Sequence, residues 1–257
     1  MPTDPASELL AAVQNIATAL PSPVELAGDF AICGDVHVPY TDWSMALRVA
    51  AVARKELKRP RRLIVAGDFW NMDAYSHYPP IAPAPGWQEE KRAGKALANA
   101  WAATFEEIYF LMGNHERRKT KFVAAQEDDT DIFAPLASVA RIQSTSYGWA
   151  YVHSGGIKWL VCHPREYSIN QLVIADQLAQ KYQCNVMDFH QHHTAKGRDR
   201  FDRYDIVDCG CLQDYDRTPY TQYDVSKRPR FKESFSILRG GIASLFGDGW
   251  VDWGKYG

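Results

Sequence analysis

Five short blocks of residues carry most of the side chains in this sequence that could do metal chemistry. Each block follows an apolar run and is built largely from Asp, Asn and His. The blocks are GDVH (34–37), GDFWN (67–71), GNHE (113–116), CHP (162–164) and FHQHH (189–193). Carboxylate oxygens, amide oxygens and imidazole nitrogens bind divalent ions of the hard and borderline kind. Six of the eight histidines lie in these blocks, so together they predict a two-metal hydrolytic site.

Spacing within the blocks indicates which side chains can share one ion. Asp35 and His37 are two residues apart, as are His190 and His192. On an extended backbone, residues at this spacing point to the same side of the chain. His193 has a glutamine two residues before it, so it is not expected to complete such a pair.

The other blocks offer single ligands. Asp68 ends an apolar run with no adjacent histidine, which suits a carboxylate that bridges two ions. Asn114 offers a neutral amide oxygen, and His163 follows an apolar run with no other polar residue nearby to explain it. Any one block alone is a weak signal, because such residues are common in turns and cores. Five such blocks in a fixed order, each at the end of a predicted strand, are a strong signal for a metal site.

The elements that position these blocks alternate between strands and helices. Strand-length apolar runs cover residues 30–33, 63–66, 108–112, 158–162 and 185–189. Apolar residues at helical spacing predict helices over 7–20, 44–58, 88–107 and 168–182. This order predicts an α/β protein with a buried sheet, in which ligands collect at the carboxyl ends of the strands.

Two further segments differ from this pattern. Residues 233–254 contain short β-type runs around an Asp-Gly pair at 248–249, which predicts a closing hairpin that turns there. Residues 70–87 are rich in proline and aromatic side chains. They form either a rigid surface excursion or a wall for a ring-bearing substrate.

Bulk composition predicts an ordinary soluble protein. The 257 residues, 46% of them hydrophobic and 23% charged, can bury one large core. We therefore expect a single domain over residues 1–257, with a helical extension at 1–23. The net charge of −2 argues against a protein that mainly coats nucleic acid.

The cysteine content and the apolar runs bear on the compartment. Five cysteines, an odd number, favour structural thiols in a reducing environment, although the Cys209-Gly-Cys211 pair leaves metal binding open. The first residues have no basic region ahead of the apolar stretch, and no apolar run has the length of a membrane span. A cytoplasmic location away from membranes is expected.

The ordered blocks resemble the motifs of the calcineurin-like metallophosphoesterase superfamily. The match extends from Gly34 to His192 and so covers most of the chain. The resemblance implies a two-sheet β-sandwich flanked by helices, with four layers in the order α/β/β/α. GDVHVPY (34–40), GNHER (113–117) and GCL (210–212) resemble the compact bacterial and phage-type phosphodiesterase branch more weakly.

The resemblance also assigns roles to the residues of the blocks. One ion would be bound by four of them and the second by another four, with Asp68 shared. The first set is Asp35, His37, Asp68 and His192, and the second is Asp68, Asn114, His163 and His190. His115 would contact the substrate phosphate and donate a proton to the leaving group. Its alternative role is that of a further metal ligand.

Two positions depart from the family pattern. Phe189 stands where glycine usually precedes the HxH pair, and its ring is expected to narrow the cleft. Asn71 replaces an Asp that in some members pairs with the catalytic histidine, which would lower the pKa of the imidazolium. Asp73 could substitute for that missing carboxylate. The absence of GDxxDRG disfavours the protein-phosphatase branch.

Residues beside the blocks are candidates for substrate binding. Arg117 and Arg118 follow GNHE directly, and an arginine fork suits phosphate. His77 in the aromatic segment and Asn71 are further candidates for substrate contact.

The expected reaction is hydrolysis of phosphodiesters by a hydroxide that bridges two divalent ions, with Asp68 and His115 as the catalytic residues. The substrate would be a small phosphoester, best a 2',3'- or 3',5'-cyclic nucleotide. Mn²⁺ is the first expectation for the metal, and Fe, Zn²⁺ or Ni²⁺ suit the same ligands. The alternatives are a DNA or RNA nuclease, a phosphomonoesterase, or a metal-binding scaffold without catalysis. The sequence leaves the oligomeric state open.

Overall fold

Two six-stranded mixed sheets form the centre of the protein. The computed structural model describes residues 23–77, 83–122, 129–139, 141–219 and 231–256. The first sheet has the order β1 (Val24–Ala27), β6 (Trp149–Ser154), β7 (Ile157–Cys162), β8 (Asn185–Asp188), β10 (Asp205–Cys209) and β9 (Thr194–Arg198). The second has the order β12 (Ile242–Gly247), β11 (Ser234–Arg239), β2 (Phe30–Cys33), β3 (Arg62–Ala66), β4 (Glu107–Leu111) and β5 (Ile142–Ser144).

Parallel pairing brings the ends of the motif-bearing strands together. β2, β3 and β4 are parallel neighbours in one sheet, and β7 and β8 are parallel neighbours in the other. The register places Cys33 opposite Val65 and Ala66 opposite Leu111, so these strands end almost level. The loops after these five strands therefore leave from neighbouring strand ends.

Side chains alternate between two cores along each central strand. In β2, Phe30 and Ile32 belong to the core between the sheets, whereas Ala31 and Cys33 belong to the core beneath the helices. This period-2 pattern follows from the pleat, which turns successive side chains to opposite faces. Because the central strands β2 and β3 are apolar on both faces, this part of the second sheet is covered on both sides.

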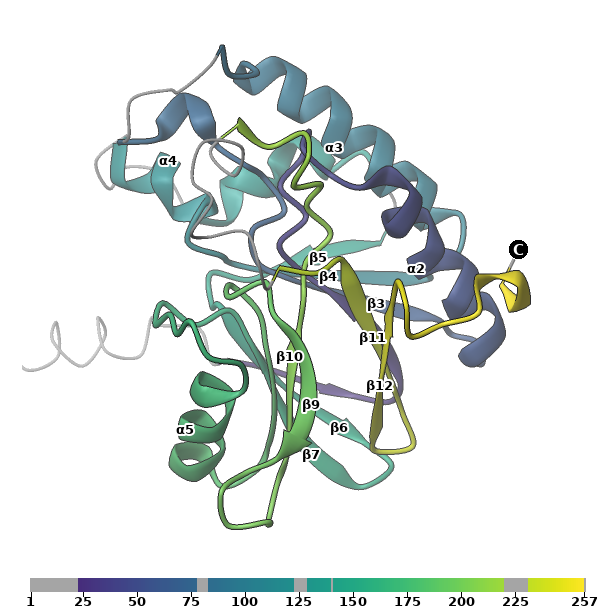
Figure 1. Cartoon of the computed structure of the whole chain (residues 1–257). Coiled ribbons are helices and arrows are strands. Elements are labelled where there is room, and N and C mark those ends of the chain that lie inside the picture. Colours follow the sequence, from purple (N-terminus) through teal and green to yellow (C-terminus); the bar gives the residue numbers. More distant parts are fainter. Residues whose placement is uncertain (1–22, 78–82, 123–128, 140, 220–230, 257) are drawn as a thin grey trace, which may run out of the picture.

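Helices cover the outer faces of the two sheets, as Figure 1 shows. The helices α2 (Trp43–Glu56) and α3 (Trp87–Ala102) lie over the second sheet, and α5 (Val173–Tyr182) lies over the first. A short α4 (Glu116–Phe122) begins inside the GNHE block. The expected four-layer α/β/β/α sandwich is confirmed.

Helix boundaries differ from the sequence expectation in two places. The third expected helix ends at Ala102 instead of residue 107, because Glu107 already pairs with Arg62 in the parallel β3–β4 ladder. The helix expected from residue 168 begins only at Val173, preceded by Leu172 in a left-handed conformation. The helix expected over 7–20 lies outside the described residues.

The closing hairpin is present, but its turn is not at the Asp-Gly pair. β11 and β12 pair from Ser234 with Gly247 to Arg239 with Ile242, so the turn is Gly240-Gly241. Both glycines have positive φ, 57° and 83°, which a two-residue hairpin turn of this hand requires. The expected turn at 248–249 is therefore wrong.

The aromatic segment after Asp68 packs its tryptophans inward. Trp70 is fully buried, and its ring lies edge-to-face on the ring of Trp87 at 5.1 Å between centroids. Neither indole is therefore placed as an open wall for a substrate ring. Residues 78–82 of this segment lie outside the described residues.

Phe189 does not narrow the cleft. Its ring is 1% exposed and belongs to the core between the sheets, where it lies against Gly34. A Cβ on Gly34 would come within 2.6 Å of the Phe189 ring. The phenylalanine therefore fills space beneath the loops that carry the motif blocks, and the glycine beside it accommodates the ring.

Candidate metal centre

The five motif blocks meet in the loops that follow β2, β3, β4, β7 and β8. Each block begins at the last residue of its strand or within two residues after it. Three groups of side chains there have potential ligand atoms within 4.8 Å of one another. These groups are Asp35, His37 and His192; His37, Asp68 and His115; and Asp68, His163 and His190. All residues in them are buried except the half-buried His190.

The backbone that brings these side chains together is not extended. Five of the predicted ligands have a positive φ between 48° and 77°. They are Asp35, His37, Asp68, His190 and His192. The argument that an i, i+2 spacing places them on one side of a strand is therefore wrong. Left-handed conformations are unfavourable for residues with a Cβ and persist only where the surroundings hold them.

Hydrogen bonds between the loops hold this conformation. The Asp35 N–H donates to the carbonyl of Gly67 at 3.0 Å, and the His37 N–H donates to the carbonyl of Asp68 at 2.9 Å. The His190 N–H donates to the Asp35 carboxylate at 2.8 Å. Loops from both sheets are thus tied to one another at the site.

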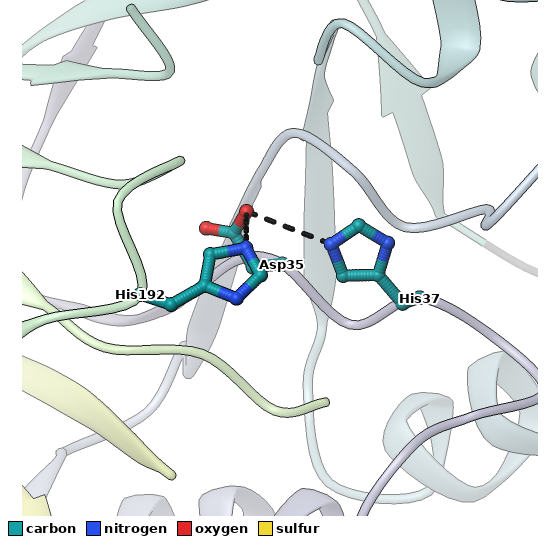
Figure 2. Close-up of side chains that lie close together, drawn as sticks. All are labelled: Asp35, His37 and His192. Carbon is teal, nitrogen blue, oxygen red and sulfur yellow. Dashed lines mark ion pairs between the residues drawn. The ribbon is translucent and has the colours of Figure 1, made fainter. Parts of the chain in front are cut away.

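In the first ligand group two imidazoles lie on either side of the Asp35 carboxylate. Figure 2 shows Asp35 between His37 and His192. The Oδ1 atom of Asp35 lies 3.0 Å from His192 Nε2 and 3.8 Å from His37 Nε2. Three ligand atoms therefore face a common point.

The second group is centred on Asp68, which also reaches the first. Its Oδ2 atom lies 3.4 Å from His163 Nε2 and 3.8 Å from His37 Nε2. Asn114 Oδ1 lies 2.9 Å from His163 Nε2, and the His190 ring lies 5.1 Å from the His163 ring. Asp68 therefore stands between the two groups, where a shared carboxylate would have to be.

The donor atoms at this site fit divalent ions. Asp35 Oδ1 and His37 Nε2 are buried, and apart from the ion pair of Asp35 Oδ1 with His192, neither has a hydrogen-bond partner among the described residues. A buried polar atom without a partner is costly, and a cation would satisfy both atoms at once. Carboxylate, amide oxygen and imidazole nitrogen also form the donor set that transition-metal ions accept.

Electrostatics within the site also favours cations. Burial alone would raise the pKa of Asp35, but the imidazoles of His192 and His163 outweigh it and hold the pKa well below its usual range. For Asp68, His163 and His115 outweigh burial in the same direction. Both carboxylates are therefore ionised, and the surroundings must supply positive charge.

The histidines respond to the same charges. Burial would lower the pKa of His163, but Asp68 and Asp35 raise it to about 9. Asp35 likewise raises the pKa of His192 against burial. Burial, assisted by the neighbouring His163, lowers the pKa of His190 to about 4. In this state protons on His163 and His192 provide the positive charge that the carboxylates require.

Outer hydrogen bonds orient two of the imidazoles. Asn71 Oδ1 lies 3.1 Å from His37 Nδ1, and the Tyr215 hydroxyl contacts His192 Nδ1. Each of these contacts holds the Nδ1 atom of its ring and leaves the Nε2 atom facing the carboxylates. Hydrogen bonds to metal-ligating histidines orient the ring in the same way. Asn71 is buried and contacts a predicted ligand with its side chain. The structure therefore gives Asn71 a contact that orients the His37 ring.

His115 is held by its own pair of contacts. Its Nδ1 lies 2.7 Å from the Asn71 carbonyl, and its Nε2 lies 2.7 Å from Nη2 of Arg118. Because the guanidinium can only donate, Nε2 accepts and Nδ1–H donates to the carbonyl. Burial is the main cause that lowers the pKa of His115, and Arg118 adds to it. Asp73 lies 4.0 Å from Arg118, so this carboxylate acts on His115 only through the arginine.

A sequence match agrees with this geometry. The model of the family described as calcineurin-like phosphoesterase matches residues 28–225. The chain belongs to the calcineurin-like phosphoesterase family. Its fold and its buried cluster of aspartates and histidines are those of a metallophosphoesterase. No curated protein matches the chain.

Several solved structures are similar to this chain at low sequence identity. A hypothetical protein from Pyrococcus horikoshii is 6% identical, with a TM-score of 0.50, over 86% of this chain and 88% of its own. Vps29 from Chaetomium thermophilum is 9% identical, with a TM-score of 0.46, over 85% and 96%. A predicted phosphoesterase from Streptococcus pneumoniae is 12% identical, with a TM-score of 0.38, over 86% and 97%. At such identities the likeness shows the fold alone.

The remaining candidate residues of this phosphoesterase lie in different places. His77 is exposed and belongs to none of the three groups of possible ligands. Arg117 donates to the carbonyl of Ser146 at 2.6 Å and lines a cavity beside Asn114. His193 is buried with its Nδ1 3.8 Å from the Asp208 carboxylate, away from the three ligand groups.

Two residues that contact the site, Glu116 and Tyr215, were missed by the sequence reasoning. Arg118, a candidate for phosphate binding from the sequence, contacts the imidazole of His115 three residues before it, a spacing that places two side chains together on a helix. Glu116 belongs to the GNHE block but had no role assigned to it. Tyr215 carries no local signal, because its contact with His192 joins segments 23 residues apart.

Proposed function

We propose that the protein is a dinuclear-metal-dependent phosphodiesterase. The observation that carries this proposal is the position of Asp68 between two buried ligand groups, within 3.8 Å of His37 and 3.4 Å of His163. A shared carboxylate between two sets of nitrogen and oxygen donors suits two ions at the separation of roughly 3.5–4 Å found in such hydrolases.

The proposed ligand sets follow the two groups. One ion would be held by Asp35, His37, Asp68 and His192, and the other by Asp68, Asn114, His163 and His190. When bound, the ions would supply Lewis-acid polarisation of a phosphoryl group and a water-derived nucleophile near neutral pH. Mn²⁺ is the first ion to test, followed by Fe, Zn²⁺ and Ni²⁺.

His115 is the proposed proton donor to the leaving group. Its Nε2 lies 3.8 Å from Asp68 Oδ2 at the edge of the ligand groups, and it accepts from Arg118. A substrate phosphoryl group would draw the guanidinium of Arg118 onto its own oxygens, since arginine pairs well with phosphate. Nε2 would then be available to carry and deliver a proton.

The proposed substrate is a small phosphodiester, with 2',3'- or 3',5'-cyclic nucleotides as the first choice. Trp70 is buried and Trp87 is half-buried against it, so the tryptophans of the 70–87 segment do not support base stacking there. Support for an aromatic substrate group comes instead from the cavity beside Asn114.

A substrate panel tests the proposed reaction. Metal-stripped protein is loaded with each ion in turn and given an aryl phosphomonoester, an aryl phosphodiester, both kinds of cyclic nucleotide, and single-stranded DNA. We expect the diesters to be hydrolysed at least tenfold faster than the monoester, and the small diesters faster than DNA. An Asp35→Asn variant purified in parallel controls for contaminating hydrolases. A monoester preference, or no turnover with any ion, would overturn the proposal.

A further inference from the structure

A cavity opens directly beside the second ligand group. It has a volume of about 280 Å³, close to the lower end of the roughly 300–1,000 Å³ that small-molecule sites occupy. Asn114 and His163 form part of its wall, so it borders the second ligand group of the proposed metal site. From there it extends between the start of β6, the end of β7 and the helix α5, on the outer side of the first sheet. Figure 1 shows α5 lying along this sheet.

Aromatic rings form one wall of this cavity. Trp149 is half-buried, with its ring 5.8 Å from the Tyr147 ring and 6.2 Å from the Tyr182 ring. Leu160 and Leu178 add aliphatic surface. Three neighbouring rings with aliphatic surface between them are suited to a flat aromatic group, because rings pack well in offset and edge-to-face arrangements.

The same cavity is lined by more positive than negative charge. Arg117, Arg165 and Lys181 line it, against a single carboxylate from Glu166. Arg165 and Lys181 are exposed, so their charges meet a ligand at the mouth of the cavity. Arginine and lysine beside aromatic rings form the combination with which proteins bind bases and phosphates together.

We propose that this cavity binds the nucleoside part of a nucleotide phosphodiester whose phosphoryl group lies at the metal site. The inference rests on the proposed phosphodiesterase function and names its substrate class. The base stacks against the ring of Trp149, and Arg165 and Lys181 meet the oxygens of the sugar or of a further phosphate. The cavity thus selects diesters that carry a base over diesters that do not.

Two esters with the same leaving group separate the cavity from the reaction centre. Thymidine 5'-(p-nitrophenyl phosphate) carries a base, and methyl p-nitrophenyl phosphate does not. In a Trp149→Leu variant and in an Arg165→Ala/Lys181→Ala variant we expect KM for the thymidine ester to rise about tenfold or more. A rise of this size corresponds to the loss of one stacking or charge contact with the substrate. KM and kcat for the methyl ester should stay within twofold of the wild-type values. The matched control is Arg92→Ala/Lys95→Ala, which removes two exposed cations of α3.

The pattern of changes decides the outcome. Equal losses on both esters would assign these residues to general stability or catalysis and overturn the cavity proposal. Unchanged KM for the thymidine ester in both variants would overturn it as well. Because Trp149 packs against the apolar cluster around α5, the surface double variant keeps the test valid if Trp149→Leu folds poorly.

Binding measured without turnover separates this proposal from the proposed reaction. Thymidine 5'-monophosphate is titrated calorimetrically into metal-free wild-type protein and the same variants. We expect binding by the wild type that weakens at least tenfold in the cavity variants and is unchanged in the α3 control. Binding with this pattern in a protein that hydrolyses no ester would support the cavity and reject the phosphodiesterase. No binding, or equal binding by all variants, would reject the cavity even where esters are hydrolysed.

Discussion

The carboxylate of Glu116 accepts a hydrogen bond from the backbone N–H of Asp68 at 2.9 Å, although the two residues are 48 positions apart. The same carboxylate accepts from the N–H groups of Trp70 and Gly113, also at 2.9 Å. Glu116 thereby joins the loop after β3 to the loop after β4. The carboxylate proposed to bridge two ions is therefore positioned from the backbone side by a second, fully buried carboxylate.

We call the three hydrogen bonds accepted by Glu116 the Glu116 clamp. Removing the clamp should weaken both the fold and metal binding. In Glu116→Ala three buried N–H groups lose their acceptor, at a cost of about 1–3 kcal/mol each. We expect a loss of several kcal/mol in the free energy of unfolding. We also expect metal affinity to fall by about 10–100-fold, as for other residues that support metal ligands. Urea unfolding and calorimetric metal titration measure the two effects. Glu25→Ala, at an exposed position, should change neither, and unchanged metal affinity in Glu116→Ala would contradict the clamp.

Metal binding should release protons near neutral pH. The pKa of His163 is raised to about 9 and that of His192 is also raised, so both imidazoles hold protons at pH 7 in the metal-free protein. A divalent ion requires neutral imidazole and displaces these protons. Affinity for Mn²⁺ should therefore increase from pH 7 to about 9. Calorimetric titration in two buffers of different ionisation enthalpy gives the number of protons released, and a value of zero would contradict the assignment.

Replacing His115 should remove turnover without removing metal. For His115→Ala we expect kcat to fall by about 10²–10⁴-fold, the usual contribution of a general acid. The two ions should remain, as counted by elemental analysis of the purified protein. Loss of one ion would instead make His115 a ligand, which its place in a group with His37 and Asp68 allows.

Arg118 should act on the same step as His115. Its guanidinium contacts His115 Nε2 at 2.7 Å and the Asn71 carbonyl at 3.0 Å. We expect Arg118→Met to lower kcat for phosphodiesters at least tenfold with unchanged metal content, and Arg118→Lys to restore part of it through its charge. Arg92→Ala, at an exposed position on α3, is the control. Wild-type kinetics in Arg118→Met would remove the arginine from the mechanism.

Glu90 should make stability depend on pH. It is fully buried in α3, and burial is the main cause that raises its pKa from 4.5 to about 8. Between these values the folded protein keeps a proton that the unfolded chain has lost. The contribution of Glu90 to stability is therefore complete below pH 4.5 and is lost as the pH rises through about 8.

Glu90→Gln cannot ionise, and it should lose less stability than the wild type between pH 5 and pH 9. Urea unfolding at both pH values measures the difference. Glu89→Gln at the exposed neighbouring position should follow the wild type. Parallel losses in Glu90→Gln and the wild type would show that the carboxyl of Glu90 does not ionise as assigned.

The amino-acid sequence by itself determined the strands and the blocks that follow them. Continuous apolar runs need two covered faces, and polar blocks at the ends of parallel strands must meet at one edge. These are local properties of pattern and direction. The α/β class and the identity of the clustered residues could therefore be predicted from these patterns, whereas the two-sheet sandwich was predicted from the family resemblance of residues 34–37, 67–71, 113–116, 162–164 and 189–193.

Only the tertiary structure decided how those residues are held. The left-handed backbone at Asp35 and His192 depends on hydrogen bonds between loops. The burial of Phe189 depends on space left by Gly34 in another strand loop. The clamp of Glu116 on Asp68 joins segments that chain spacing does not connect. A one-dimensional pattern carries side-chain type and period, whereas the direction of a side chain in a loop is set by whatever packs against it from elsewhere in the chain.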